Sequence, residues 1–230
     1  MPFTYKGKVI KKEYVTETVI HIRIEHIDPA EMTFTAGQYF TVLIDKGVSR
    51  AYSIGSSIQD RNFMDTYVDI TPGGPGSKFF ENIVLGQEVN YIAPMGKFTY
   101  EESGSPVIFA STGTGIVPFI SMVDSALNSG STRKMLILQG VRHSKDIYLQ
   151  DKLDFWKSQF HNFNYEFCIT RDESWNGKKG RITEFLPEFI NQFGSESVIY
   201  TCGVKEAVNS VIDIAKSSGI AEENIKYEKY

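Results

Sequence analysis

The chain has 230 residues, of which 41% are hydrophobic and 23% are charged, and its formal net charge at pH 7 is −4. The apolar fraction excludes a disordered chain. The acidic balance argues against non-specific binding to nucleic acids.

The chain has two cysteines, Cys168 and Cys202, which cannot form a disulfide framework or hold a four-cysteine iron–sulfur cluster. Its longest apolar runs are far shorter than the about 20 residues that span a bilayer. No signal peptide is visible at the N-terminus. We therefore expect a cytoplasmic protein whose redox chemistry, if it has any, comes from an organic cofactor.

The first hundred residues have the pattern of short strands. In residues 19–25, Ile20, Ile22 and Ile24 alternate with polar side chains, which is typical of a half-buried strand. Similar segments are residues 37–44, 67–70 and 88–92, and they are separated by residues typical of turns. This spacing predicts an antiparallel barrel or sandwich. A short helix is indicated only at residues 79–85.

After about residue 105 the pattern changes. Short apolar runs, typical of strands buried on both faces, are followed by segments with helical periodicity. The runs are residues 107–110, 135–138, 165–169 and 197–200, with a fifth strand expected at residues 225–229. The helical segments are residues 119–127, 149–160 and 204–215. Alternation of strands and helices predicts a doubly wound parallel sheet. The polar residues 101–105 mark the expected domain boundary.

Ligands of an open parallel sheet bind beyond the carboxyl ends of its strands. After the first expected strand comes the sequence Ser-Thr-Gly-Thr-Gly-Ile-Val-Pro at residues 111–118. Gly113 and Gly115 allow close approach of a ligand, Thr112 and Thr114 add hydroxyls, and the following helix offers free N–H groups to a pyrophosphate. A strand-to-helix turn without a ligand is the alternative, and a glycine pair alone would not decide between the two.

Three arginines follow the next strand ends. Arg142 stands where an NAD site of the usual type carries Asp or Glu, and Arg171 and Arg181 follow the third strand. Each of them alone is best interpreted as an ordinary surface residue. Together they favour a phosphate dianion, and hence the 2′-phosphate of NADP, because guanidinium groups bind phosphate in bidentate fashion. Cys202, after the fourth strand, is interpreted as a small buried residue rather than a nucleophile.

In the first half, residues 50–53 (Arg-Ala-Tyr-Ser) are followed about twenty positions later by residues 73–77 (Gly-Gly-Pro-Gly-Ser). Residues 50–53 alone fit a strand with an ion pair. With the glycine-rich segment they supply a cation, an aromatic ring and an N–H-rich loop, the parts needed for a flavin and its pyrophosphate. Tyr230 has two interpretations: it belongs to a frayed tail, or it is a functional aromatic residue at the end of a sheet strand.

The order of these motifs resembles the ferredoxin–NADP reductase family over essentially the whole chain. The shared segments are residues 50–53, 74–77, 94–96, 112–118, 140–142, 170–171, 202–203 and 228–230. The resemblance implies a six-stranded antiparallel FAD-binding barrel at residues 1–102. It also implies an NADP-binding domain with a five-stranded parallel sheet at residues 103–230.

The resemblance also implies roles for individual residues. Arg50 would bind the FAD pyrophosphate, Tyr52 would pack on the isoalloxazine ring, and Ser53 would bond near flavin N5. The FAD site would include Arg50, Ala51, Tyr52, Ser53, Val68, Asp69, Ile70, Gly76, Ser77, Thr112 and Tyr230. The NADP site would include Gly113, Thr114, Gly115, Val141, Arg142, Thr170, Arg171, Arg181, Cys202, Gly203 and Val204. Ser53, Cys202, Glu228 and Tyr230 would be catalytic, and no metal is expected.

The chain departs from both branches of the family. Plant-type members carry a Lys and a Tyr where this chain has residues 175–182, which is closer to the bacterial branch. Many bacterial members end in a longer tail, whereas this sequence stops at Tyr230, as the plant type does. If the ring of Tyr230 covers the flavin, it must swing away before nicotinamide can stack there.

The resemblance implies that NADPH delivers hydride to FAD and that electrons then pass singly to a ferredoxin or flavodoxin. A reductase that serves an oxygenase, or one that reduces free flavin, is the alternative. The absence of a Cys-rich segment argues against a fused plant-type [2Fe–2S] domain but not against a separate ferredoxin. A flavin-binding module without turnover is a further alternative. A basic patch for an acidic partner would come from Lys6, Lys8, Lys11, Lys12, Lys78 and Lys97, although a solvated charged face also explains these lysines.

Overall fold

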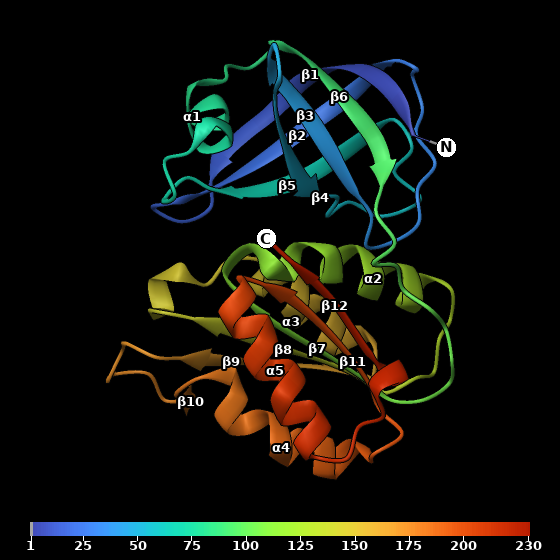
Figure 1. The fold of residues 1–230 in the computed structure, drawn as a ribbon, viewed down its shortest axis with the longest axis vertical. Coiled ribbons are helices and arrows are strands. Elements are labelled where there is room, and N and C mark those ends of the chain that lie inside the picture. Colours follow the sequence, from blue (N-terminus) through green and yellow to red (C-terminus); the bar gives the residue numbers. More distant parts are fainter. Residues whose placement is uncertain (1) are drawn as a thin grey trace. The chain divides into compact units, whose positions relative to one another are not determined.

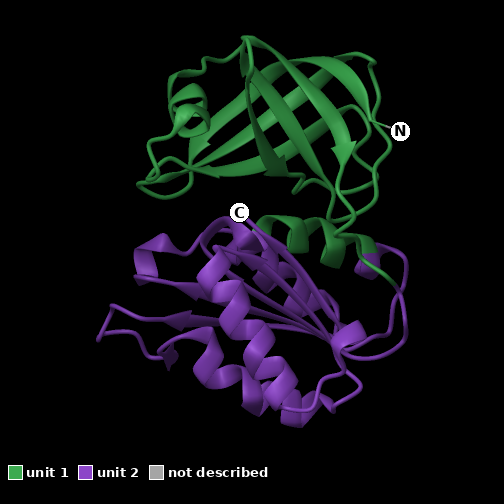
Figure 2. Ribbon diagram, viewed as in Figure 1, with its two compact units in different colours: residues 1–101, 117–125 green, residues 102–116, 126–230 purple. Residues whose placement is uncertain are grey.

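The structure is a computed structural model that describes residues 2–230. The chain forms two compact units, which Figure 2 shows in different colours. The first unit consists of the residues up to 101 together with 117–125, and the second consists of residues 102–116 and 126–230.

The first unit contains six strands: β1 (Phe3–Tyr14), β2 (Val19–Asp28), β3 (Tyr39–Asp45), β4 (Val48–Ser53), β5 (Phe63–Asp69) and β6 (Glu88–Met95). They form one antiparallel sheet in the order β4-β3-β6-β1-β2-β5 (Figure 1). The sheet curls so that its two edges meet. The Gly55 N–H donates to the Asp65 carbonyl at 2.8 Å, and the Thr66 hydroxyl donates to the Ser53 carbonyl at 3.0 Å. The predicted six-stranded antiparallel barrel is confirmed.

The two faces of β2 differ as its alternation predicts. Ile20, Ile22 and Ile24 are fully buried in the barrel core. The opposite face is polar but less exposed than the pattern suggests, because His21 lies 2.8 Å from the Asp65 carboxylate and is itself buried. Arg23 donates to both oxygens of the same carboxylate at 2.8 Å. The polar face of β2 therefore holds this strand to β5.

The sequence pattern did not predict β1. Tyr5 and Val9 point into the core, but Gly7 stands between them and interrupts the apolar alternation. A side chain at position 7 would not fit, since its Cβ would lie 2.6 Å from Cγ2 of Ile24. The close approach of β1 and β2 therefore requires glycine at the position where a strand pattern needs an apolar residue.

The helix α1 (Pro75–Asn82) begins earlier than predicted. The expectation of a helix at residues 79–85 was wrong in its bounds. Proline suits the first turn of a helix because it has the required φ and needs no N–H partner there. Ile83 is extended and ends the helix. Gly76 and Ser77, which we predicted to lie in a loop, therefore belong to the first turn of α1.

The second unit contains β7 (Val107–Thr112), β8 (Met135–Val141), β9 (Phe163–Ile169), β10 (Lys178–Lys179), β11 (Val198–Gly203) and β12 (Ile225–Lys229). All neighbouring strands are parallel, in the order β10-β9-β8-β7-β11-β12. The predicted doubly wound parallel sheet is confirmed. It has one strand more than expected, the two-residue β10, which is too short to show a pattern.

The helical segments of this half are η1 (Gly113–Ile116), α2 (Val117–Asn128), η2 (Ser144–Asp146), α3 (Gln150–Gln159), α4 (Ile182–Phe193), α5 (Lys205–Ser217) and η3 (Glu222–Asn224). We did not predict α4, because Pro187 lies inside it and proline usually ends a helix. Its apolar side chains, among them Leu186 and Ile190, share a core with α5 and the sheet. Figure 1 shows α4 and α5 on one face of this sheet and α3 on the other. Within residues 2–230, no helix is long and apolar enough to cross a membrane.

Candidate functional sites

The first candidate site is built around β4. Arg50 and Ala51 are exposed, whereas Tyr52 and Ser53 are half-buried. The Arg50 guanidinium donates to the Ser49 carbonyl at 2.7 Å. Among the described residues it forms no ion pair with a carboxylate, so the ion pair that would explain the motif without a ligand is not present. The cation remains available to an anion.

Gly76 brings the two motifs of this unit together. A Cβ at position 76 would lie 3.1 Å from Cγ of Arg50 and would collide with the hydroxyl of Tyr52. The first turn of α1 therefore lies directly against β4, and only glycine permits this approach. The N–H groups of that turn have no partner within the helix, and the turn packs on the side chain of Arg50. This combination fits a phosphate-containing ligand.

The ring of Tyr52 is held by other aromatic rings. It packs edge-on against Phe80 with the ring centroids 4.9 Å apart, and it lies 6.0 Å from the ring of Phe40. Burial raises the pKa of Tyr52 to about 12, so its hydroxyl stays protonated. Of the other predicted residues, Val68 and Asp69 are the last two of β5. Val68 is buried in the core, and the hydroxyl of Ser77 donates to the Asp69 carbonyl at 3.2 Å.

The second candidate site lies at the carboxyl ends of β7, β8, β11 and β12. The register places Ser111 beside Gln139 and Cys202, and it places Cys202 beside Glu228. Gly115 packs directly on β11. A Cβ at position 115 would lie 2.7 Å from the carbonyl carbon of Cys202 and closer still to its oxygen. The turn from β7 into η1 therefore requires glycine at this position.

Gly113 and Gly203 are required for different reasons. Gly113 has a φ of +55° and open space around it, so backbone conformation alone favours glycine there. Gly203 has a φ of +150°, and a Cβ there would lie 2.8 Å from the hydroxyl of Thr112. The ends of β7 and β11 are thus packed against each other through glycine. Beyond them Val204 is exposed and precedes α5 without a side-chain cap.

A buried hydrogen-bond network that we did not predict supports this turn. The amide nitrogen of Gln139 donates to the Gly113 carbonyl at 2.8 Å, and the hydroxyl of Ser111 donates to the amide oxygen. The hydroxyl of Tyr148 donates to the same carbonyl at 3.4 Å. The one indication in the sequence was a glutamine at the end of an otherwise apolar strand.

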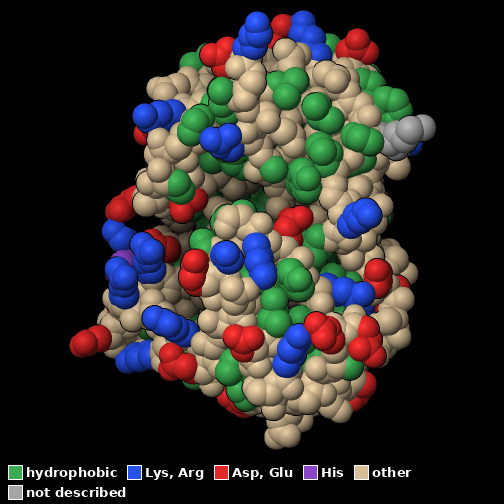
Figure 3. Space-filling view, viewed as in Figure 1, with side chains coloured by type: hydrophobic (Ala, Val, Ile, Leu, Met, Phe, Trp, Pro, Cys, Tyr) green, Lys and Arg blue, Asp and Glu red, His purple; other side chains and the backbone are tan. Residues whose placement is uncertain are grey.

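The structure brings Arg142 and Arg171 to adjacent positions. The N–H of Arg171 donates to the carbonyl of Arg142 at 2.8 Å, and the Thr170 N–H donates to the Val141 carbonyl at 3.3 Å. Arg181 caps the N-terminus of α4, and its N–H donates to the Glu184 carboxylate at 2.9 Å. Figure 3 shows that basic side chains gather over the loops that follow β8 and β9.

All three guanidinium groups are exposed, and none forms an ion pair with a carboxylate within residues 2–230. Asp172, which follows Arg171 in the chain, bonds to hydroxyls instead. Its carboxylate accepts hydrogen bonds from the hydroxyl groups of Ser144 and Ser174, which lower its pKa to about 2. The cations beside it therefore remain free to bind an anion.

Cys202, Glu228 and Tyr230 lie at the ends of β11 and β12. Burial, together with the charge of Glu228, raises the pKa of the Cys202 thiol well above its usual value, which agrees with our interpretation that it is not a nucleophile. Burial raises the pKa of Glu228 to about 7. Tyr230 is 62% exposed, its N–H donates to the Gly203 carbonyl at 3.3 Å, and its hydroxyl lies 3.3 Å from that of Thr114. The residue that follows β12 is thus held beside the glycine turn.

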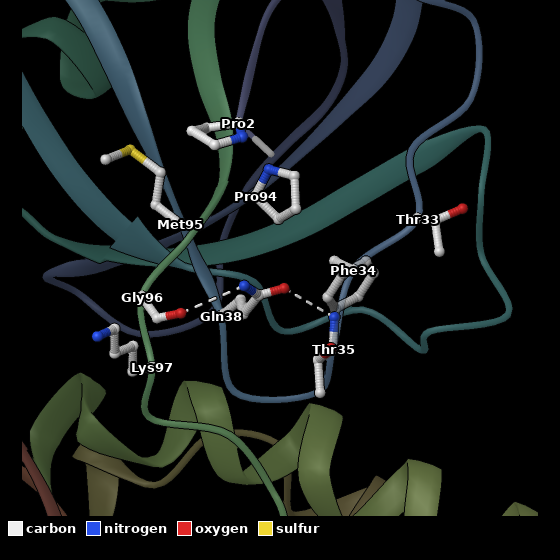
Figure 4. A pocket seen from close by; sticks show the side chains of 9 residues that line it. All are labelled: Pro2, Thr33, Phe34, Thr35, Gln38, Pro94, Met95, Gly96 and Lys97. Carbon is white, nitrogen blue, oxygen red and sulfur yellow. Dashed lines mark hydrogen bonds between the residues drawn. The ribbon is translucent and has the colours of Figure 1, made fainter.

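A separate open groove of about 630 Å³ lies in the first unit (Figure 4). Gln38 crosses it, since its side chain accepts from the Thr35 N–H at 2.8 Å and donates to the Gly96 carbonyl at 3.3 Å. The groove is lined by Pro2, Thr33, Phe34, Thr35, Gln38, Pro94, Met95, Gly96 and Lys97. It includes none of the predicted site residues, and its lining has no titratable side chain other than Lys97.

Most lysines of the expected basic patch are already engaged. Lys6 pairs with Glu88 at 2.8 Å, Lys8 with Glu25 at 3.3 Å and Lys11 with Glu13 at 2.8 Å. Lys12 donates to the carbonyls of Glu81 and Ile83 at the end of α1. These contacts favour the alternative interpretation, a solvated charged face, over a patch for an acidic partner.

Comparison with known proteins identifies the family. The oxidoreductase FAD-binding domain matches residues 6–100, and the oxidoreductase NAD-binding domain matches residues 109–212. The chain belongs to the ferredoxin reductase-like family of oxidoreductases, which bind FAD and NAD(P). The predicted family is therefore confirmed, as are FAD and a nicotinamide dinucleotide as the cofactors.

The relatives include both kinds of reductase that we weighed. Ferredoxin–NADP reductase B of Sorangium cellulosum is 27% identical over 98% of this chain and 97% of its own length. The electron transfer component of toluate 1,2-dioxygenase from Pseudomonas putida is 28% identical over 98% of this chain and 67% of its own length. The chain spans 64% of the anthranilate 1,2-dioxygenase electron transfer component of Acinetobacter baylyi. Among solved structures, a ferredoxin–NADP+ reductase from Neisseria gonorrhoeae superposes with a TM-score of 0.86 at 21% identity, over 98% of both chains.

Proposed function

We propose that this oxidoreductase is a ferredoxin(flavodoxin)–NADP+ reductase, which takes hydride from NADPH and exchanges single electrons with a ferredoxin or flavodoxin. Bound FAD would supply the conversion between two-electron and one-electron transfer, while the protein binds, orients and tunes it. Residues 1–102 would bind FAD and residues 103–230 would bind NADP(H).

In the FAD site, Arg50 and the N–H groups of the first turn of α1 would bind the pyrophosphate. The close packing of Gly76 on Tyr52 and on Cγ of Arg50 supports this, because it brings the first turn of α1 against the Arg50 side chain. Tyr52 would support the flavin ring, and Ser53 would bond near flavin N5. The other residues assigned to this site by the resemblance, Ala51, Val68, Asp69, Ile70, Ser77, Thr112 and Tyr230, remain proposed contacts.

The observation that carries the choice of NADP is the pair formed by Arg142 and Arg171. A backbone hydrogen bond joins their loops, both side chains are exposed, and the described residues offer neither of them a carboxylate ion pair. Two free guanidinium groups on neighbouring loops suit the 2′-phosphate dianion. Arg181 at the start of α4 would be the third. Gly113, Thr114 and Gly115 would face the pyrophosphate, with Val141, Thr170, Gly203 and Val204 around the nucleotide.

Four residues are proposed to act at the reacting groups. Ser53 and Glu228 would position the reactants and handle protons, and a carboxyl with a pKa of about 7 can hold or release a proton near neutral pH. Cys202 would shape the nicotinamide pocket as a neutral thiol. Tyr230 would cover the flavin and swing away when nicotinamide binds.

A reductase component of an oxygenase system is the second candidate. Toluate and anthranilate dioxygenase components are among the relatives, and the ion-paired lysines of β1 weaken the argument for a basic docking surface. The fold and the nucleotide site support both candidates equally, because each requires NAD(P)H, FAD and one-electron transfer. Reduction of free flavin is a further outcome of the same chemistry. A non-catalytic flavin module is disfavoured, since it would not need exposed arginines at successive strand ends.

An anaerobic titration of the FAD-loaded protein tests the core of the proposal. NADPH should bleach the flavin absorbance at lower concentration than NADH does. A yellow protein that neither nucleotide bleaches would indicate a non-catalytic module. Cytochrome c reduction that depends on added ferredoxin or flavodoxin would then support the proposed ferredoxin(flavodoxin)–NADP+ reductase. Direct reduction of free flavin at a higher rate would support a free-flavin reductase.

A further inference from the structure

Gln139 stands out in the sheet of the second unit. β8 is buried along its whole length, and Gln139 is the one polar side chain in it, with 2% of its surface exposed. An amide in such a place is costly unless its donors and acceptor find partners. A methionine or leucine would fill the same volume without that requirement, so packing alone does not account for glutamine here.

The partners of Gln139 both belong to the glycine turn. Its oxygen accepts from Ser111, which ends the buried part of β7, and its nitrogen donates to the carbonyl of Gly113 at 2.8 Å. Tyr148 supplies the second donor to this carbonyl at 3.4 Å. The Gly113 oxygen therefore accepts hydrogen bonds from two buried side chains.

Fixing this carbonyl also fixes the next amide. In a planar trans peptide the C=O of Gly113 and the N–H of Thr114 point in opposite directions. The N–H of Thr114 is therefore held facing away from Gln139. Because η1 begins at Gly113, this N–H has no acceptor within the helix. Glycine has more accessible backbone conformations than other residues, and these hydrogen bonds help to hold Gly113 at its φ of +55°.

We propose that Gln139 is a positioning residue that holds the Gly113–Thr114 peptide so that its N–H donates to the pyrophosphate of a bound dinucleotide. This inference rests on the proposed function of the turn. It adds a specific assignment: Gln139 governs affinity for the pyrophosphate that NADPH and NADH share, whereas the arginine pair governs the 2′-phosphate that only NADPH carries.

The test separates these two contributions with two nucleotide fragments. ADP-ribose contains the pyrophosphate but no 2′-phosphate, and 2′-AMP contains the 2′-phosphate but no pyrophosphate. Their binding to the FAD-loaded protein is measured by calorimetry for the wild type, Gln139→Met and Arg142→Ala. Ser197→Ala is the control. Ser197 is, like Gln139, a buried polar residue of this unit, but its hydroxyl donates to the Gly194 carbonyl before β11 begins.

Gln139→Met should weaken ADP-ribose about tenfold, the effect expected for one hydrogen bond to a charged group. It should leave the affinity for 2′-AMP unchanged, and Arg142→Ala should have its main effect on 2′-AMP. Steady-state assays of Gln139→Met should show higher KM values for NADPH and NADH in the same proportion, with kcat retained. Tyr148→Phe, which removes the weaker donor, should act in the same direction by a smaller factor.

Equal binding of ADP-ribose to Gln139→Met and to the wild type would overturn the inference while leaving the proposed function intact. Equal losses for both fragments would also overturn it, because they would indicate general damage to the unit. If Gln139→Met does not fold, Tyr148→Phe decides on the same two criteria. A wild-type protein that binds neither fragment would refute the proposed nucleotide site itself.

Discussion

Glu228 should make the stability of the protein depend on pH in a way that one substitution removes. Burial raises the pKa of this carboxyl from 4.5 to about 7 in the folded protein. At about 1.4 kcal/mol per pKa unit, this shift corresponds to about 3 kcal/mol. The folded state thus holds a proton that the unfolded state releases between pH 4.5 and 7. The contribution of Glu228 to stability is complete below pH 4.5 and is lost as the pH rises through 7.

Glu228→Gln keeps the shape of the side chain and cannot ionise. Its free energy of unfolding should match that of the wild type at about pH 4 and exceed it at about pH 8.5 by up to about 3 kcal/mol. Urea unfolding of both proteins across this range, at constant FAD and salt, measures the difference directly. Other titrating groups cancel because both proteins contain them. Glu223→Gln, at an exposed position before the same strand, serves as the control. A difference between Glu228→Gln and the wild type that does not change with pH would refute the reasoning.

Further substitutions test the nucleotide site. Gly115→Ala should lower the free energy of unfolding by about 1–3 kcal/mol and displace the turn, because its Cβ would lie 2.7 Å from the carbonyl carbon of Cys202. Gly113→Ala has open space and should lose only about 1 kcal/mol through its positive φ; equal losses in urea unfolding would contradict the steric argument. Arg142→Ala combined with Arg171→Ala should raise the KM for NADPH far more than that for NADH, and equal increases would mean that the 2′-phosphate assignment is wrong. Tyr230→Ser should tighten nicotinamide binding and weaken selectivity for NADPH over NADH in flavin difference spectra, whereas unchanged affinities would remove the gate from the mechanism.

Segments whose apolar residues follow a single period could be predicted from the sequence. The alternation of Ile20, Ile22 and Ile24 and the apolar runs of the second half predicted their strands correctly, because burial alone determines such patterns. The elements that escaped prediction contain a residue chosen for a local steric reason. Gly7 interrupts the pattern of β1 because β2 passes too close for a side chain, and Pro187 lies in α4, where packing of its apolar face outweighs one lost hydrogen bond.

In the candidate sites, the motifs predicted which residues take part, whereas the contacts that orient these residues are seen only in the structure. The glycines and arginines at strand ends were visible because their spacing is tied to the ends of predicted elements. The contacts that orient them were not, since they join residues far apart in the chain. Ser111 and Gln139 are 28 positions apart, as are Ser144 and Asp172. No periodicity connects such pairs, and they become neighbours only when the strands align in register.

Asp172 shows how a contact between residues far apart in the chain changes the charge available at the nucleotide site. Asp172 follows Arg171 directly in the chain, and an ion pair between them would neutralise the cation needed for a phosphate. In the structure the hydroxyls of Ser144 and Ser174 take up the carboxylate of Asp172 and keep its pKa near 2. The acid stays ionised, yet it forms no ion pair with Arg142 or Arg171. The loops can therefore keep Arg142 and Arg171 close together and open to an anion at the same time.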